Sequence, residues 1–284
     1  MNAEPPPLPS LPGGGGPAVR ALDPRRPGWW THLLLLAAYP VVLGALGSAQ
    51  TQEDAAPMLP GTTAELILVC VLELAIFGGV FAIAWRCSRA TSEQLHLAWR
   101  GGPLPLLRGF GYAIALRMLV AFATLVVLGA GMAAGVLDAQ TFSETGPQID
   151  AIVGPETLKN NPAYLFVAMT FLSFIVAGLR EELWRAGVIA ALIALFPKTF
   201  SSVRGKVAAV MIAATLFGLG HLPQGWMAVG MIGLLGVGLG LILVFHRSLW
   251  DAVIAHGFFD AASFAMLYLL ANLPPEVLKK MGAQ

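Results

Sequence analysis

Charged residues are scarce in this sequence, and their scarcity indicates the class of protein. Only 12% of the 284 residues are charged and 57% are hydrophobic, whereas a soluble globular domain carries about 25% charged residues. The net charge is +1, and there is no basic stripe or nucleic-acid-binding motif, so we expect no nucleic-acid partner. The composition predicts a polytopic membrane protein whose surroundings are the lipid bilayer.

Cysteine is also rare. Cys70 lies within an apolar run, and Cys87 lies at the end of the same run between Arg86 and Arg89. This spacing offers neither a disulfide framework nor a thiolate metal site. Redox chemistry is therefore not expected.

What the chain has in abundance is long apolar runs. Residues 1–28 are rich in Pro and Gly and predict a disordered basic tail, and residues 274–284 form a C-terminal tail. Over residues 29–273 we expect one all-α bundle of transmembrane helices, because a span needs roughly 20 apolar residues. Seven spans are predicted, or eight if the longest run breaks at Arg180. They are Trp29–Gly47, Thr63–Trp85, Phe110–Val136, Ala163–Pro197, Val207–His221, Trp226–Phe245 and Leu249–Leu273.

Loop charges predict the orientation of the bundle. The segment Arg86–Arg108 carries four arginines, whereas Gln50–Gly61 and Asp138–Asn161 hold acidic residues with only Lys159 in return. The positive-inside rule places the arginines and the N-terminus in the cytoplasm. A single crossing by the longest run puts the basic residues that follow it on the same side. We expect a multi-pass integral protein of a bacterial inner membrane.

Four charges inside the longest apolar run need an explanation. The stretch Arg180-Glu181-Glu182-Leu183-Trp184-Arg185 interrupts Ala163–Pro197. A charged side chain at bilayer depth costs on the order of a few kcal/mol, so it usually faces a cavity or a partner. Two adjacent carboxylates suit a group that must take a proton near neutral pH. The alternative is a helix break at the membrane surface, with snorkelling arginines and solvated glutamates.

Other charges lie in the apolar runs before this stretch. Glu65 and Glu73 lie in the second predicted span, and Arg117 lies in the third. We expect Glu73 and Arg117 to pair across the two helices in a structural role, because neither belongs to a recognisable motif.

Two later spans each carry a histidine. The fifth ends with Phe217-Gly218-Leu219-Gly220-His221, and the seventh contains His256 and Asp260, which share one helix face because they are four residues apart. A single membrane histidine is more often an interhelical hydrogen bond than a catalyst. Together with the diglutamate, however, these clusters supply the parts of a water-activating hydrolase site.

In this order the three motifs resemble those of the CPBP intramembrane proteases, which include the CAAX prenyl-protein endopeptidases and bacteriocin-processing or immunity proteins. Phe217 with His221 matches the second motif, and His256 with Asp260 matches the third in its Asp form. The resemblance covers about residues 163–266.

The first motif departs from the family pattern. The family usually has E-E-x-x-x-R, whereas only two residues separate Glu182 from Arg185 here. The shorter spacing rotates the arginine by about 100° on a helix. We therefore expect Arg185 to pair with Glu181 in the i,i+4 register, and the usual role of the arginine is in doubt.

The resemblance implies an intramembrane endopeptidase acting on a membrane protein or a lipidated peptide. It implies that Glu181 activates water as the general base, while Glu182 assists it or holds His221. His221 and His256 would orient the water or bind a metal, and Asp260 would position the tetrahedral intermediate.

Metal dependence stays open at this point. Glu181, His221 and His256 match a catalytic zinc shell in residue type, and the same set suits a metal-free glutamate mechanism. We expect no tightly held metal.

Two other classes of function compete with the protease. The bundle could be a non-proteolytic scaffold or immunity protein that binds a membrane partner, which needs no particular ionisable groups. A proton-coupled transporter could also use buried glutamates and histidines, but the symmetric broken helices of such transporters are missing from the sequence.

Overall fold

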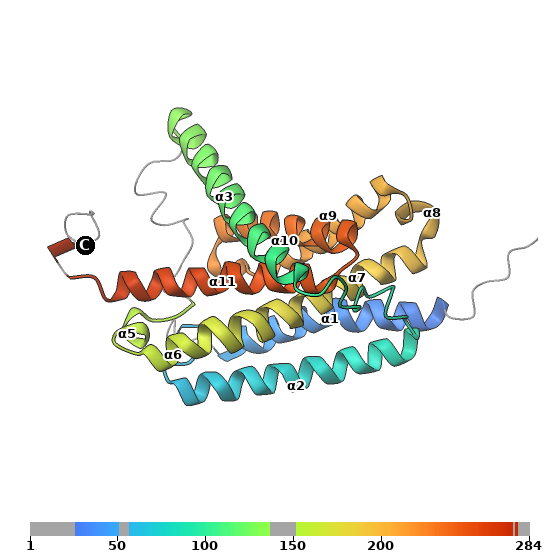
Figure 1. The fold of residues 1–284 in the computed structure, drawn as a ribbon, viewed down its shortest axis with the longest axis horizontal. Helices are drawn as coiled ribbons and strands as arrows, with labels where there is room; N and C mark the ends of the chain where they lie inside the picture. Colours follow the sequence, from blue (N-terminus) through green and yellow to red (C-terminus); the bar gives the residue numbers. More distant parts are fainter. Residues whose placement is uncertain (1–25, 51–56, 137–151, 275, 278–284) are drawn as a thin grey trace, which may run out of the picture.

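The computed structural model describes residues 26–50, 57–136, 152–274 and 276–277 (Figure 1). Over these residues every regular element is helical and there is no strand, which confirms the all-α class. Most of the predicted N-terminal tail, residues 138–151 of the acidic loop and most of the C-terminal tail lie outside the described residues.

Four helical segments run side by side along the long axis of the molecule, namely α1, α2, the segment from α6 to α7, and α11 (Figure 1). Helix α3 packs against α11 near its start and then leaves the bundle at an angle. The elements in chain order are α1 (Arg26–Gln50), α2 (Thr63–Ser88), α3 (Leu104–Ala133), α5 (Pro155–Leu158), α6 (Pro162–Val167), η2 (Ala168–Glu181), α7 (Glu182–Leu195), α8 (Pro197–Phe200), α9 (Val203–Leu219), η3 (Leu222–Gln224), α10 (Trp226–His246) and α11 (Leu249–Ala271).

Five helices in the described part of the chain are long and apolar enough to cross a membrane. Helix α9 has 17 residues, somewhat fewer than the roughly 20 that a bilayer requires. The seven or eight spans that the sequence predicts are therefore not confirmed, and their number stays a prediction. The five are Thr63–Ser88, Leu104–Ala133, Pro162–Leu195, Trp226–His246 and Leu249–Ala271.

The longest of these helices passes through the diglutamate without a break. It contains 34 residues, which corresponds to roughly 50 Å at 1.5 Å per residue. Its central part, η2, is a π-helix of 14 residues, with i→i+5 hydrogen bonds of the kind that often mark functional sites. The chain thus has one continuous helix here rather than a break at Arg180, as a single crossing requires.

Contacts at the helix ends bring the basic segments together. Trp30 at the start of α1 packs on Phe196 at the end of α7, with ring centroids 5.6 Å apart. Gly28 lies against the backbone of Cys87, so the arginine-rich segment after α2 begins at the same end. The basic residues after α7 and those after α2 therefore share one end of the bundle.

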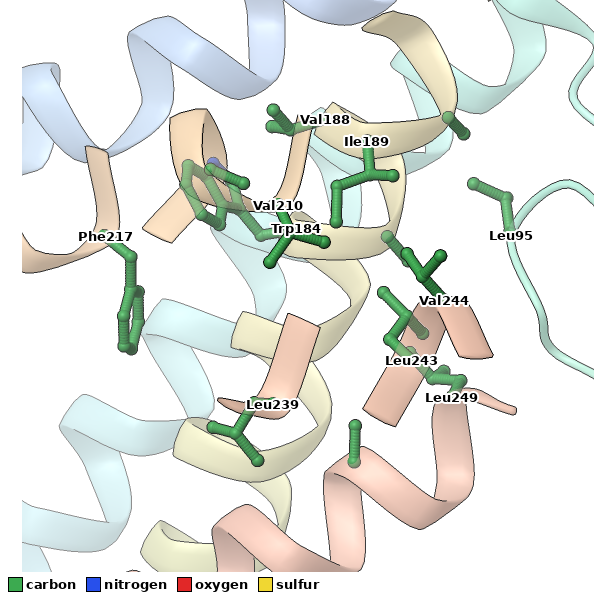
Figure 2. Close-up of a cluster of buried hydrophobic side chains, with 14 of the residues drawn as sticks. Leu95, Trp184, Val188, Ile189, Val210, Phe217, Leu239, Leu243, Val244 and Leu249 are labelled. Carbon is green, nitrogen blue, oxygen red and sulfur yellow. The ribbon is translucent and has the colours of Figure 1, made fainter. Parts of the chain in front are cut away.

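An apolar core between α7, α9 and α10 supports the diglutamate helix (Figure 2). Val210, Leu239 and Leu243 are fully buried there. Trp184 packs into the same core and donates a 2.8 Å hydrogen bond from Nε1 to the carbonyl of Leu36, which ties α7 to α1. Since lipid is as apolar as these side chains, their close packing rather than hydrophobic transfer holds the helices together.

The start of α11 is fixed by the segment between α2 and α3. The backbone N–H of Leu249 donates to the carbonyl of His96 at 2.9 Å. The fully buried Asp251 accepts a 2.7 Å hydrogen bond from Nε of Arg108. These contacts set the position of α11 and hence of His256, seven residues after its first residue.

The titration of His96 gives a test of this anchor. Burial, reinforced by Arg247, Lys206 and Arg100, lowers the pKa of His96 to about 4, whereas the unfolded chain has a His pKa of about 6.5. As the pH falls, the unfolded state takes up a proton on His96 before the folded state does. The contribution of neutral His96 to the free energy of unfolding is therefore complete above about pH 6.5 and is lost as the pH falls toward 4.

We expect His96→Asn to flatten this part of the pH dependence, measured as the melting temperature of the detergent-solubilised protein. The backbone at His96 is left-handed, with φ of 55°, and Asn is among the residues that most often adopt this conformation. An unchanged slope in the variant would contradict the assignment.

Candidate active site

The site is built where the diglutamate helix packs along α11. Glu181 is the last residue of η2 and Glu182 the first of α7, while His256 lies on α11. The two helices approach closely because α11 has no side chain at Gly257, where a Cβ would lie 2.3 Å from the ring of Phe174. The close approach brings the carboxylates within reach of the imidazole.

Glu182 and Arg185 form an ion pair inside the bundle. Both residues are 0% exposed. Nη1 of Arg185 donates to Oε1 of Glu182, and Nδ1 of His256 lies 2.9 Å from the same oxygen. If His256 is neutral, Nδ1–H donates to the carboxylate and Nε2 is left as an acceptor. Glu182 therefore orients the histidine and joins α7 to α11.

Glu181 faces the other nitrogen of His256. Its Oε2 lies 3.8 Å from Nε2 of His256, and its Oε1 accepts a 2.7 Å hydrogen bond from Nη2 of Arg180. Oδ2 of Asp260 lies 3.5 Å from the same Nε2. These separations exceed the roughly 2.7–3.2 Å of a direct hydrogen bond, and a water molecule can bond to Glu181 and His256 together.

His221 packs on the ring of Phe217, which also contacts His256. Its Nδ1 is 2.9 Å from the carbonyl of Phe217, and its ring centroid is 4.9 Å from that of Phe217. The Phe217 ring in turn meets His256 edge-on at 6.2 Å. The expectation that Glu182 holds His221 is therefore wrong in this structure, because Glu182 holds His256.

The expected i,i+4 pair of Glu181 with Arg185 is also wrong. Arg185 pairs with Glu182, three residues earlier, and Arg180 pairs with Glu181. Glu181 and Glu182 lie four and three residues before Arg185, and both spacings allow a pair on a helix. Because Arg180 bonds to Glu181, Glu182 is left as the partner of Arg185.

The expected pair of Glu73 with Arg117 does not form either. Glu73 accepts a hydrogen bond from Arg180. Arg117 donates to the carbonyl of Phe259 and, at 2.9 Å, to Oγ of Ser263, with its guanidinium 4.5 Å from the centre of the Phe259 ring. The reason is that α3 packs against α11.

The residues expected for zinc do not fit a zinc shell as they are arranged. A catalytic zinc site needs three protein ligands converging on one point. Within the described ranges, no group of three or more His, Cys, Asp or Glu side chains could hold a metal ion. Nδ1 of His221 faces a backbone carbonyl, and Glu181 is bonded to Arg180.

Arg185→Gln tests the buried ion pair. We expect it to lower the free energy of unfolding by about 3–5 kcal/mol, because Glu182 would remain buried without its partner. Chemical unfolding in detergent measures the change. Lys159→Gln is the control, since it removes the exposed pair of Lys159 with Glu156 at 3.6 Å and should cost less than about 1 kcal/mol. Equal effects of the two substitutions would contradict a stabilising role for Arg185.

Comparison with protein families gives a match over residues 163–262 to the type II CAAX prenyl endopeptidase Rce1-like family. The matched segment runs from α6 into α11. No curated protein and no solved structure matches the chain. The matched segment includes all six residues that the sequence predicts for the site, namely Glu181, Glu182, Arg185, His221, His256 and Asp260. The match over residues 163–262, the part of the chain that builds the site, supports a relationship to the CPBP, or CAAX protease, family.

Proposed function

We propose that the protein is an intramembrane endopeptidase that hydrolyses a peptide bond of a membrane-associated peptide or protein, with water activated by Glu181. The observation that carries the proposal is the arrangement of Glu181, His256 and Glu182. Oε2 of Glu181 and Nε2 of His256 face each other across 3.8 Å, while Glu182 holds the opposite nitrogen of the histidine. This arrangement resembles an oriented histidine beside a carboxylate base.

In the proposed reaction, a water molecule donates one hydrogen bond to Glu181 and the other to Nε2 of His256. Glu181 takes a proton from the water as the water oxygen attacks the carbonyl carbon of the scissile bond. Asp260, in its protonated form, donates a hydrogen bond to the oxygen of the tetrahedral intermediate. The proton on Glu181 then passes to the leaving nitrogen as the C–N bond breaks, which restores the carboxylate.

The position of the site restricts the substrate class. Glu181 and Glu182 lie well inside the 34-residue apolar helix, so the scissile bond must enter the bilayer region. A membrane protein or a lipidated peptide satisfies this requirement, and a prenylated CAAX peptide is the first substrate to test because of the family match.

We further propose that the end of the bundle with the basic segments faces the cytoplasm, as the positive-inside rule predicts. The protein would be a multi-pass protein of a bacterial inner membrane with a cytoplasmic N-terminus. The test uses single cysteines at Ser92 and Lys159, both exposed, in a chain with Cys87→Ser because Cys87 is exposed. A membrane-impermeant maleimide added to whole cells should label position 159 and spare position 92. The reverse pattern would refute the orientation.

Glu181→Gln tests the proposed base. The substitution preserves size and hydrogen bonding but removes the proton acceptor, so turnover of a farnesylated CAAX peptide or a single-span membrane peptide should fall by about 10²-fold or more. Glu156→Gln, on an exposed residue outside the site, is the matched control. Full cleavage by a well-folded Glu181→Gln protein would end the glutamate-base mechanism.

The same experiment separates the protease from a scaffold. A non-proteolytic scaffold or immunity protein would cleave neither the farnesylated peptide nor the single-span peptide. Its Glu181→Gln and Glu156→Gln variants would still bind a membrane partner as long as the bundle folds. If the wild-type protein cleaves a peptide and Glu181→Gln does not, the result supports the protease and not the scaffold.

A further inference from the structure

Glu73 is an ionisable residue in the membrane-spanning helix α2, outside the segment that matches the protease family. Its side chain is 36% exposed, and a carboxylate at this depth is costly unless it has a partner. Its partner is Arg180, which donates from Nη1 to Oε2 of Glu73. The pair joins α2 to the helix that carries the site.

Arg180 divides its guanidinium between two carboxylates. Nη1 bonds to Glu73, and Nη2 bonds to Oε1 of Glu181 at 2.7 Å. The side chain of Arg180 is only 16% exposed, so its orientation depends on these partners. Because the guanidinium is a rigid planar fork, a carboxylate fixed at one nitrogen fixes the direction of the other.

This geometry determines which oxygen of Glu181 is available. Arg180 occupies Oε1, and Oε2 is left facing His256. The charges matter as well, since one guanidinium between two carboxylates leaves a net negative charge. Without Glu73, Arg180 and Glu181 would form a neutral pair, and the guanidinium would be free to bond to both oxygens of Glu181.

We propose that Glu73 is a positioning residue of the active site, which acts through Arg180 to keep one oxygen of Glu181 free for the attacking water. This inference rests on the proposed function. The competing role for Glu73 is purely structural, a tie between α2 and η2 that any well-packed residue could replace.

The test compares Glu73→Gln and Glu73→Asp with wild type on the farnesylated CAAX peptide and the single-span peptide, in detergent. Glu65→Gln is the matched control, because it makes the same change in α2 at an exposed residue near the helix start. We expect Glu73→Gln to lower kcat roughly tenfold with KM unchanged, the lower end of the range for residues that orient a ligand indirectly. Glu73→Asp, which keeps the charge, should recover most of kcat, and Glu65→Gln should match wild type.

The melting temperature separates positioning from packing. A lower kcat at an unchanged melting temperature and KM supports the inference. It is overturned if Glu73→Gln has the kcat of wild type, or if its loss of activity comes with a lower melting temperature and a raised KM. An inactive wild-type protein overturns the proposed function and this inference together, whereas an active wild type with a neutral Glu73→Gln overturns the inference alone.

Discussion

The ion pair of Glu182 with Arg185 constrains the rest of the bundle. Both side chains are fully buried, and removing two charges from water is unfavourable unless each finds a close partner and further hydrogen bonds. His256 supplies one of these bonds, which requires α11 to lie against α7 at this level. The hydrogen bond from Trp184 to α1 and the apolar packing on α9 and α10 then hold α7 in the orientation that keeps the pair buried.

Around this pair, carboxylates alternate with arginine and histidine side chains across several helices. Such alternation lowers the cost of each charge in a low dielectric, where an isolated one would be expensive. In this series Glu181 has one bonded and one free oxygen. Its Oε1 accepts a hydrogen bond from Arg180, whereas its Oε2 faces Nε2 of His256. The series runs Glu73, Arg180, Glu181, His256, Glu182 and Arg185.

Local patterns in the sequence predict the helices and the order of the motifs. The partners of the charged side chains depend instead on which helices pack together in the fold. The apolar runs define α2 and α11, and the spacing of His256 and Asp260 places both on one helix face. The pairing of Arg185 could not be predicted, because Glu181 and Glu182 both lie at helical pairing distances from it, and the choice depends on Arg180 bonding to Glu181. The partner of Glu73 depends on which helices are neighbours, and the sequence does not show that α3 packs against α11.

The central claim is that Glu181 acts on water as a base and forms no bond to the substrate. A single turnover in H₂¹⁸O, followed by mass spectrometry of the product and of the peptide that contains Glu181, tests it directly. The account predicts that the new carboxyl group of the product carries ¹⁸O and that Glu181 carries none. Label in the Glu181 carboxylate, with an unlabelled product, would show a covalent acyl-enzyme and contradict the account.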